Sequence, residues 1–335
     1  MLKVIADKTA IKKYARQFIR KFKPFTDTQV KVKLGHQGAS FPAKVSYSKD
    51  LGIWMFAHTV RDVRYWNAFG IGKPQPGALL SITSEINFPW MGIDRKTGAA
   101  FAEDAWSNVF VIHRGKIGGG KKGIGKYLFE KNYRGVWSFM EDGDCVSRVA
   151  VIGTLQSPRL ALQTAHFVRK IETLKSAAAL SPQTAFNFPE ITFREDLIGS
   201  LPSAEEQDIA ARCDHDLVVG NLAALLQRAR LKTGNDHNRE IFLTDQFKNK
   251  ISHVFAVPAD NKENTILAAA AKLLLQTTDP AADSLPVLVL PEDKINLYAP
   301  LLQKIGITVI GYRMEEDRII FSDLGKIKPG LNMQL

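Results

Sequence analysis

The sequence has few of the features that identify common protein classes. Its two cysteines, Cys145 and Cys213, lie far apart, and neither has a cysteine or histidine at metal-site spacing beside it. This excludes a disulfide framework and a zinc finger, and it is typical of a reducing compartment. No stretch approaches the roughly 18 apolar residues of a membrane span, and the basic N-terminus does not have the pattern of a signal peptide. We therefore expect a cytoplasmic protein without a membrane partner.

Motifs of several enzyme classes are also missing. The chain has no nucleophile elbow, no His-Glu-x-x-His motif and no dinucleotide-binding fingerprint. The acidic pair Glu141-Asp142 falls in a polar segment, and we interpret it as surface. Asp214 and Asp216 lie two residues apart in a predicted helix, so their side chains do not converge on a metal ion. We interpret these two residues and the neighbouring His215 as helix-surface charge, and the sequence predicts no metal site.

Charge is distributed unevenly along the chain. Residues 1–175 contain 29 Lys and Arg against 13 Asp and Glu, a net charge of +16, whereas residues 176–335 contain 16 against 21, a net charge of −5. This asymmetry predicts a polyanionic partner, a nucleic acid, for the first half only. A basic protein whose lysines are merely solvated is the alternative. The basic residues do not gather on one amphipathic helix, which disfavours a membrane surface.

The first half has the pattern of a β-rich domain. Residues 7–22 and 159–175 have apolar residues at helical spacing, and short β-branched or aromatic runs lie between them. In one of these runs, Val30–Leu34, apolar residues alternate with lysines as in a strand. Short strands at close spacing predict a barrel-like domain or a curved sheet over residues 1–175. Residues 176–204, rich in Ala, Ser and Pro, are predicted to form a linker.

The second half, residues 205–335, alternates helices and strands. Helices are predicted at residues 205–231, 264–276 and 294–304, and strands at residues 239–244, 251–257, 285–290 and 307–312. Continuous apolar strands between helices are typical of a sheet covered on both faces, which is an α/β arrangement. The whole chain is therefore predicted to have two domains, of the α+β or α/β class.

Three segments of the second half suggest a family. Gly234–Leu243 places Glu240 early in the first strand of an antiparallel pair, and residues 285–292 and 305–310 are predicted to form two closing strands. With the order helix, antiparallel pair, helix, strand, helix, strand, residues 205–315 resemble the core of the PD-(D/E)XK, or restriction-endonuclease-like, nuclease superfamily. The resemblance implies that Glu240 is the first catalytic acid, and that acids hold Mg²⁺ while a lysine orients the attacking water.

The second motif of that family is missing here. On residues 254–258, Ala256 stands where the resemblance requires an acid, and Pro258 stands where it requires the lysine. Alanine cannot ligate a metal, and proline has no amine and no backbone N–H. We therefore expect a degenerate nuclease fold with no assigned cofactor. Mg²⁺ is expected only if an active endonuclease has recruited other acids beside Glu240, and a generic α/β layer is a further alternative.

A glycine-rich basic segment is the most unusual part of the first half. Residues 114–126 contain six glycines and five Lys or Arg. Glycine lets the backbone approach an anion closely and present its N–H groups. Gly120–Lys126 matches the nucleotide-binding G-x-x-x-x-G-K pattern, but Tyr127 replaces the hydroxyl residue that would bind Mg²⁺. We favour a clamp on a DNA or RNA phosphate chain over ATP or GTP binding or a flexible hairpin tip. Its expected contacts are Arg114, Lys116, Lys121, Lys122 and Lys126.

Aromatic residues alternate with cations in the same half. The candidates for contacts with bases or phosphates are Arg61, Arg64, Trp66 and Trp90, and both tryptophans are expected in loops. Such side chains can stack on unpaired or flipped bases. Core positions are the alternative, and we expect them for Trp54 and Phe56. Structural roles are expected for His58 and His113.

These observations predict a DNA-binding protein of the restriction or defence type with a catalytically degenerate nuclease-like domain. One alternative is an active Mg²⁺-dependent type II or type IV-like restriction endonuclease with a diverged active site. Another is a non-enzymatic regulator that binds RNA or DNA. DNA is favoured over RNA, and a homodimer is a possible assembly.

Overall fold

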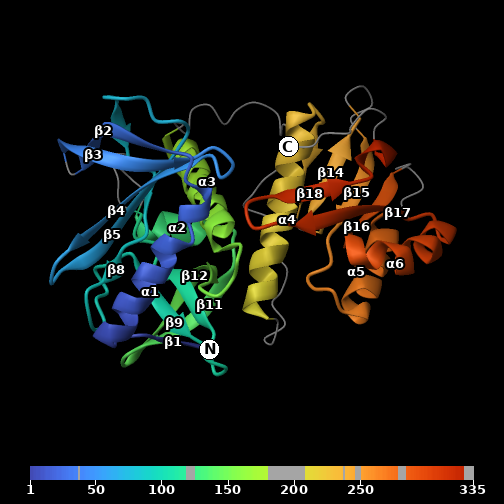
Figure 1. Cartoon of the computed structure of the whole chain (residues 1–335). Coiled ribbons are helices and arrows are strands. Elements are labelled where there is room, and N and C mark those ends of the chain that lie inside the picture. Colours follow the sequence, from blue (N-terminus) through green and yellow to red (C-terminus); the bar gives the residue numbers. More distant parts are fainter. Residues whose placement is uncertain are drawn as a thin grey trace. The chain divides into compact units, whose positions relative to one another are not determined.

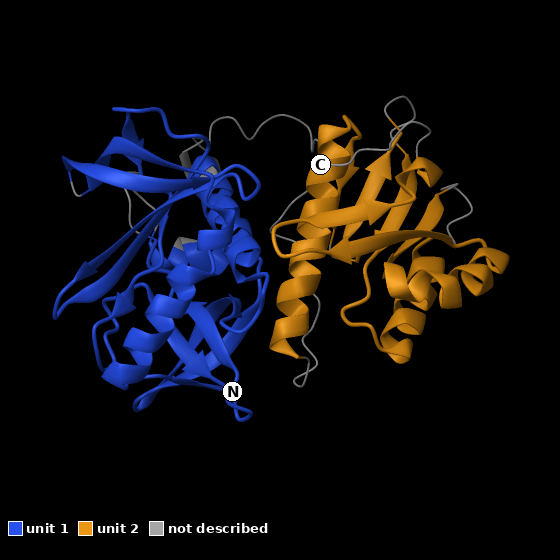
Figure 2. Ribbon diagram, in the orientation of Figure 1, with its two compact units in different colours: residues 1–185 blue, residues 186–335 orange. Residues whose placement is uncertain are grey.

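The computed structural model describes residues 1–36, 38–117, 125–179, 208–236, 238–245, 250–277 and 284–327 (Figure 1). The chain divides into two compact units, Met1–Ala185 (unit 1) and Phe186–Leu335 (unit 2) (Figure 2). Helix α3 (Leu160–Ala179) continues into the first residues of the predicted linker, and residues 180–204 of that linker lie outside the described residues. Both units combine helices with β-sheets, which confirms the predicted mixture of α and β structure.

Five strands of unit 1 close into a barrel in the order β1-β11-β12-β10-β9. They are β1 (Leu2–Val4), β9 (Ala99–Glu103), β10 (Val109–His113), β11 (Trp137–Asp142) and β12 (Cys145–Thr154). The strands carry fully buried apolar side chains such as Phe101, Val111 and Met140. Helix α3 packs against β12, and the short helix α2 (Lys126–Asn132) follows β10. The sequence had indicated neither α2 nor β11.

Unit 1 also has a seven-stranded sheet in the order β6-β2-β3-β4-β5-β7, with β8 paired to β5. Its strands are β2 (Thr28–His36), β3 (Ala39–Ser48), β4 (Ile53–Val60), β5 (Arg64–Ile71), β6 (Leu79–Ser81), β7 (Ser84–Glu85) and β8 (Phe88–Pro89). The alternation expected in β2 is confirmed, because Val32 and Leu34 are buried while Lys31 and Lys33 are exposed. Trp54 is in the core, as expected.

Helix α1 (Lys8–Arg20) covers one face of this sheet. Asp7 caps its N-terminus by accepting a hydrogen bond from the Ala10 N–H at 2.7 Å. The apolar side of the helix buries Phe18, whose ring centroid lies 6.3 Å from that of Phe69 on β5 and 5.2 Å from that of Phe88. Successive residues of a strand point to opposite faces. Trp66, three residues before Phe69, therefore lies on the face that α1 does not cover. A 3-10 turn (Lys23–Phe25) follows α1.

The described residues of unit 2 form a six-stranded sheet in the order β13-β14-β15-β16-β17-β18. The strands are β13 (Thr233–Gly234), β14 (Ile241–Thr244), β15 (Ile251–Ala256), β16 (Leu285–Pro291), β17 (Thr308–Met314) and β18 (Ile319–Ser322). The two central pairings, β15 with β16 and β16 with β17, are parallel, whereas the outer pairings are antiparallel. The predicted alternation of helices and strands is present in this unit.

Helices pack on both faces of this sheet. On one face, α5 (Glu263–Thr277) and α6 (Glu292–Lys304) bury a core that includes Val254, Leu273 and Leu302. Residues of the opposite parity, such as Phe255 and Val289, are buried on the other face, along which α4 (Ile209–Arg228) runs (Figure 1). A 3-10 turn (Leu324–Lys326) follows β18. Within the described ranges, none of the helices combines the length and the apolar character that a membrane crossing requires.

Candidate nucleic-acid interface

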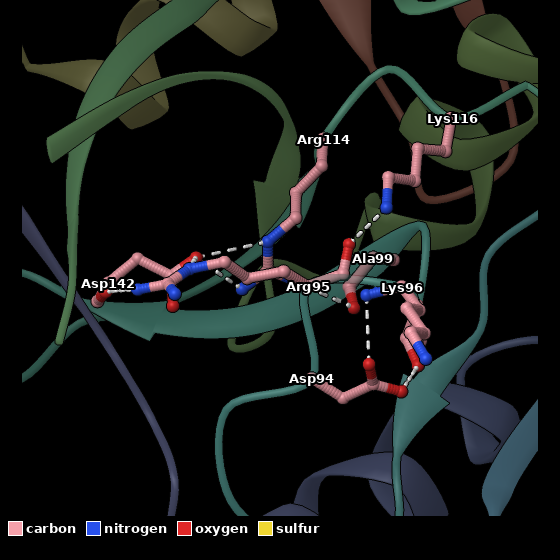
Figure 3. Close-up of polar contacts among 8 residues, drawn as sticks. Asp94, Arg95, Lys96, Ala99, Arg114, Lys116 and Asp142 are labelled. Atoms are coloured by element: carbon pink, nitrogen blue, oxygen red, sulfur yellow. Dashed lines mark hydrogen bonds and ion pairs between the residues drawn. The ribbon is translucent and has the colours of Figure 1, made fainter. Parts of the chain in front are cut away.

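Arg114, the first residue of the glycine-rich segment, makes an internal ion pair (Figure 3). It follows the last residue of β10, and its side chain is buried against Asp142 at the end of β11. The Arg114 Nη2 and Nε atoms lie 3.0 and 3.3 Å from Asp142 Oδ2, and Nη1 donates to the Ala99 carbonyl at 3.5 Å. Asp142 is only 2% exposed, so its expected surface position is wrong. The pair argues against a direct phosphate contact by Arg114, which instead fixes the start of the segment to the barrel.

His113 supports the same segment from inside unit 1. Its Nδ1 accepts the Gly115 N–H at 3.0 Å, and its Nε2 lies 3.2 Å from the Glu85 carbonyl oxygen, to which it must donate. Burial, with a smaller contribution from Arg114, lowers the pKa of His113 to about 4 despite the hydrogen bond to Glu85. The imidazole is therefore neutral at pH 7 and protonated on Nε2. This arrangement is structural, as expected.

Gly115 needs the conformational freedom of glycine. Its φ is +78°, and a Cβ at this position would lie 2.5 Å from a ring carbon of Phe129 in α2. An L-residue would be strained by the backbone and would also clash with the ring. The chain therefore leaves β10 along one defined path.

Exposed cations surround this path. Arg95 approaches the same carboxylate as Arg114, with its Nε 3.7 Å from Asp142 Oδ2, while 55% of its side chain is exposed. Lys116 is exposed and donates from Nζ to the Arg95 carbonyl (Figure 3). Lys96 is also exposed and lies in the same turn as Arg95. Two arginines share one carboxylate, so positive charge is left over. We call Arg95, Lys96 and Lys116 the cationic rim.

A polar turn holds the rim in place. Asp94 accepts the Lys96 N–H at 2.8 Å and the Thr97 hydroxyl at 2.5 Å. Desolvation raises the pKa of Asp94, but these hydrogen bonds and Arg114 outweigh it and leave the pKa below its usual value. The Arg114 N–H donates to the Gly98 carbonyl at 2.7 Å, which brings this turn beside the glycine-rich segment. Sequence reasoning missed Arg95 and Lys96 because no local pattern links the two segments.

The remaining lysines of the predicted clamp are placed differently. Lys126 begins α2, is exposed, and lies 3.5 Å from Glu130 one helical turn later. Lys121 and Lys122 belong to residues 118–124, which lie outside the described residues. Lys116 and Lys126 are thus the clamp lysines whose exposure is described.

The expected loop position of Trp66 is wrong. This residue lies within β5 and is 8% exposed, because its ring packs among residues of neighbouring strands. Trp90 does follow a strand, β8, but it is partly buried. Its ring stacks on Tyr65 with centroids 5.3 Å apart, and the Lys8 ammonium lies 5.4 Å from its centre. Arg61 is largely exposed in the turn between β4 and β5 and lies 3.5 Å from Asp62.

Trp66 is the centre of an aromatic cluster, the Trp66 cluster. Its ring centroid lies 4.9 Å from that of His36, 5.7 Å from that of Phe41 and 5.2 Å from that of Phe56. The Arg64 guanidinium carbon lies 5.7 Å from the same ring. These residues come from β2, β3, β4 and β5. No local sequence pattern predicts that these residues lie together.

Glu240 in unit 2 is held by internal partners. Its Oε1 lies 3.2 Å from Nε2 of His215 on α4, and its Oε2 accepts the Val257 N–H at 3.1 Å. Both side chains are 15% exposed, so the expected surface position of His215 is wrong. Desolvation opposes both charges, yet the attraction between the two groups and their hydrogen bonds raise the pKa of His215 and lower that of Glu240. The charged form of the pair is therefore favoured.

The residues around Glu240 do not fit a Mg²⁺ site. Ile241 pairs with Phe255, so the antiparallel register places Ala256 across from Glu240, and alanine offers no ligand. Both carboxylate oxygens of Glu240 already have partners in the protein. Among the described residues, no three His, Cys, Asp or Glu side chains are grouped so that they could hold a metal ion.

Comparisons of the chain with protein-family models, with curated proteins and with solved structures found no match. Function must therefore be inferred from the geometry and charge of the two units themselves.

Proposed function

We propose that the chain is a cytoplasmic DNA-binding protein of the restriction or defence type. Unit 1 holds the nucleic-acid backbone, and unit 2 is a PD-(D/E)XK-like domain that does not cut DNA by itself. The observation that carries the proposal is the cationic rim at the base of the glycine-rich segment. Arg95, Lys96 and Lys116 are exposed there beside a carboxylate that two arginines already share.

The chemistry of the rim suits a phosphate chain. A phosphodiester backbone presents regularly spaced anions, and each one neutralised by Lys or Arg releases condensed counterions. The net charge of +16 on residues 1–175 supplies long-range attraction to such a polymer. The segment that begins at Arg114 is rich in glycine, a residue that lets a backbone approach an anion closely. A free nucleotide is less well matched, because Tyr127 stands in place of the Mg²⁺-binding hydroxyl.

Binding across a salt series tests the proposal. We expect the combined variant Arg95→Ala, Lys96→Ala, Lys116→Ala to weaken binding to a duplex and to reduce the slope of log K against log salt by about 2 to 3. A matched control is Lys23→Ala, Lys49→Ala, Lys73→Ala, which removes the same charge from exposed lysines outside the rim. An equal loss in both variants would show general attraction rather than a site. An affinity independent of salt would contradict the proposal.

The internal pairing of Glu240 supports the non-cutting assignment of unit 2. We expect supercoiled plasmid to remain intact when it is incubated with the protein and Mg²⁺ or Mn²⁺. Cleavage that disappears in a Glu240→Gln variant would instead support the endonuclease alternative. A parallel titration with RNA of the same sequence distinguishes a DNA-binding protein from an RNA-binding regulator.

A further inference from the structure

We propose that the Trp66 cluster binds a single nucleobase, unpaired or turned out of a duplex, by stacking and by hydrogen bonds to the edge of the base. The inference rests on the proposed nucleic-acid function of unit 1 and assigns a second part of that site. The rim would hold phosphates, whereas the cluster would hold a base.

The cluster lies on the face of the sheet that α1 leaves uncovered. The register pairs His58 with Trp66 and Val60 with Arg64, so these four side chains share one face of β4 and β5. All the residues of the apolar layer on this face belong to the sheet and the short segment that follows β6. In the described part of unit 1, no helix contributes to that layer, and His58 at its edge is exposed.

The outer rings form a platform for stacking. The rings of Phe56 and His58 are nearly parallel, with an interplanar angle of 20° and centroids 6.1 Å apart. Phe56 is partly buried against Trp66, whereas His58 is exposed. Flat aromatic surfaces of this kind stack on the π-face of any base. Aliphatic ligands would gain no such contact.

Two hydrogen-bond donors at the cluster are unused. Nε1 of Trp66 and Nε of Arg64 are buried without a hydrogen-bond partner. Leaving a buried donor unsatisfied costs free energy, so a ligand that brings acceptors is favoured. Carbonyl oxygens and ring nitrogens on the edge of a nucleobase are such acceptors. A quaternary ammonium ligand has none and would also meet the positive charge of Arg64.

Glu85 links the cluster to the base of the glycine-rich segment. Its carboxylate lies 3.3 Å from Nδ1 of His36 and accepts a hydrogen bond from Asn87. Its backbone carbonyl accepts the hydrogen bond from His113, which in turn holds Gly115. One residue thus supports both the aromatic cluster and the base of the glycine-rich segment. Both sites belong to unit 1.

The test uses oligonucleotides that contain the fluorescent base 2-aminopurine. The probes are a duplex with 2-aminopurine opposite an abasic position, a single strand, and a fully paired duplex without the probe base. The double variant Phe56→Leu, His58→Ala removes the platform but keeps an apolar side chain next to Trp66. We expect it to bind the first two probes about 10-fold more weakly and to lose the quenching of 2-aminopurine, because base stacking is lost. Its affinity for the paired duplex should change less than about 2-fold, and its salt slope should remain unchanged.

Two further variants keep the result interpretable. Trp66→Phe retains a ring but removes the N–H donor, and we expect about 5-fold weaker binding of the unpaired base. Trp106→Ala is the matched control, because Trp106 is 83% exposed and lies outside the cluster. Melting temperatures within a few degrees of wild type would show that the variants fold.

The outcomes separate the two proposals. If wild-type protein binds none of the oligonucleotides, the proposed function of unit 1 fails. If it binds them and the platform variant retains both affinity and quenching, nucleobase binding by the Trp66 cluster is refuted while backbone binding stands. An effect of Trp106→Ala equal to that of the platform variant would also overturn the assignment.

Discussion

In unit 1 the buried carboxylate of Asp142 lies between two arginines, whereas in unit 2 the carboxylate of Glu240 lies between one histidine and one backbone N–H. The first arrangement leaves positive charge over, and Arg95 presents it to solvent. In the second arrangement the charge of one carboxylate is matched by one histidine, and both side chains are largely buried. A carboxylate is therefore not by itself evidence of a catalytic site, because its partners in the protein decide whether it can still act on a ligand.

The largest effect should come from breaking the pair in unit 1. Asp142→Ala would leave the Arg114 guanidinium buried without its carboxylate, and we expect unit 1 to lose about 4 kcal/mol of unfolding free energy. All five tryptophans of the chain lie in residues 54–137. Tryptophan emission during denaturant unfolding therefore reports on unit 1 alone. A loss below about 1 kcal/mol would mean that the charge pair is not a structural support.

Glu240→Ala should destabilise unit 2 by a slightly smaller amount, about 3 kcal/mol, because it removes the carboxylate that pairs with His215 and accepts the Val257 N–H. The change should appear in the far-ultraviolet circular dichroism transition and leave tryptophan emission unaltered. Glu316→Ala is a suitable control, since Glu316 is exposed and should cost less than about 0.5 kcal/mol. If the two variants were equally stable, the internal role of Glu240 would be refuted.

The dependence of the unfolding free energy on pH should also distinguish the two units, with an effect of about 2 kcal/mol on unit 1. The pKa of His113 is lowered from 6.5 to about 4, so the unfolded chain binds a proton before the folded unit does. Unit 1 should therefore lose about 2 kcal/mol between pH 8 and pH 5. His113→Asn should remove most of this dependence, and an unchanged slope in that variant would contradict the assignment. Tryptophan emission at both pH values provides the measurement.

Unit 2 should respond in the opposite direction near neutral pH. The pKa of His215 is raised by Glu240 and Asp216 against the cost of burial. Its stabilising contribution is therefore complete below the unfolded pKa of 6.5 and is lost as the pH rises through the folded value. The pKa of Glu240 is lowered, so its contribution is lost only in acid, as the pH falls through that folded value. The difference between wild type and His215→Gln in the circular dichroism transition isolates this effect.

Local patterns in the sequence predicted many of the secondary-structure elements. The alternation of Val32 and Leu34 with Lys31 and Lys33 predicted β2, because side chains in a strand alternate between faces. Helical spacing predicted α1, with Phe18 on its buried side. Trp66 was misplaced into a loop because its neighbours are charged and polar, and only pairing with β4 reveals a strand.

The sequence by itself determined the uneven charge, the mixture of helices and strands, and the presence of Ala256 and Pro258, which can neither ligate a metal nor supply an amine. Each of these follows from composition or from local periodicity. The tertiary structure decided which charges remain available, because it paired Arg114 with Asp142 and Glu240 with His215, residues 28 and 25 positions apart. It also gathered the Trp66 cluster from four strands and set Arg95 and Lys96 beside Lys116. Such contacts depend on strand register and helix packing, which no short stretch of sequence specifies.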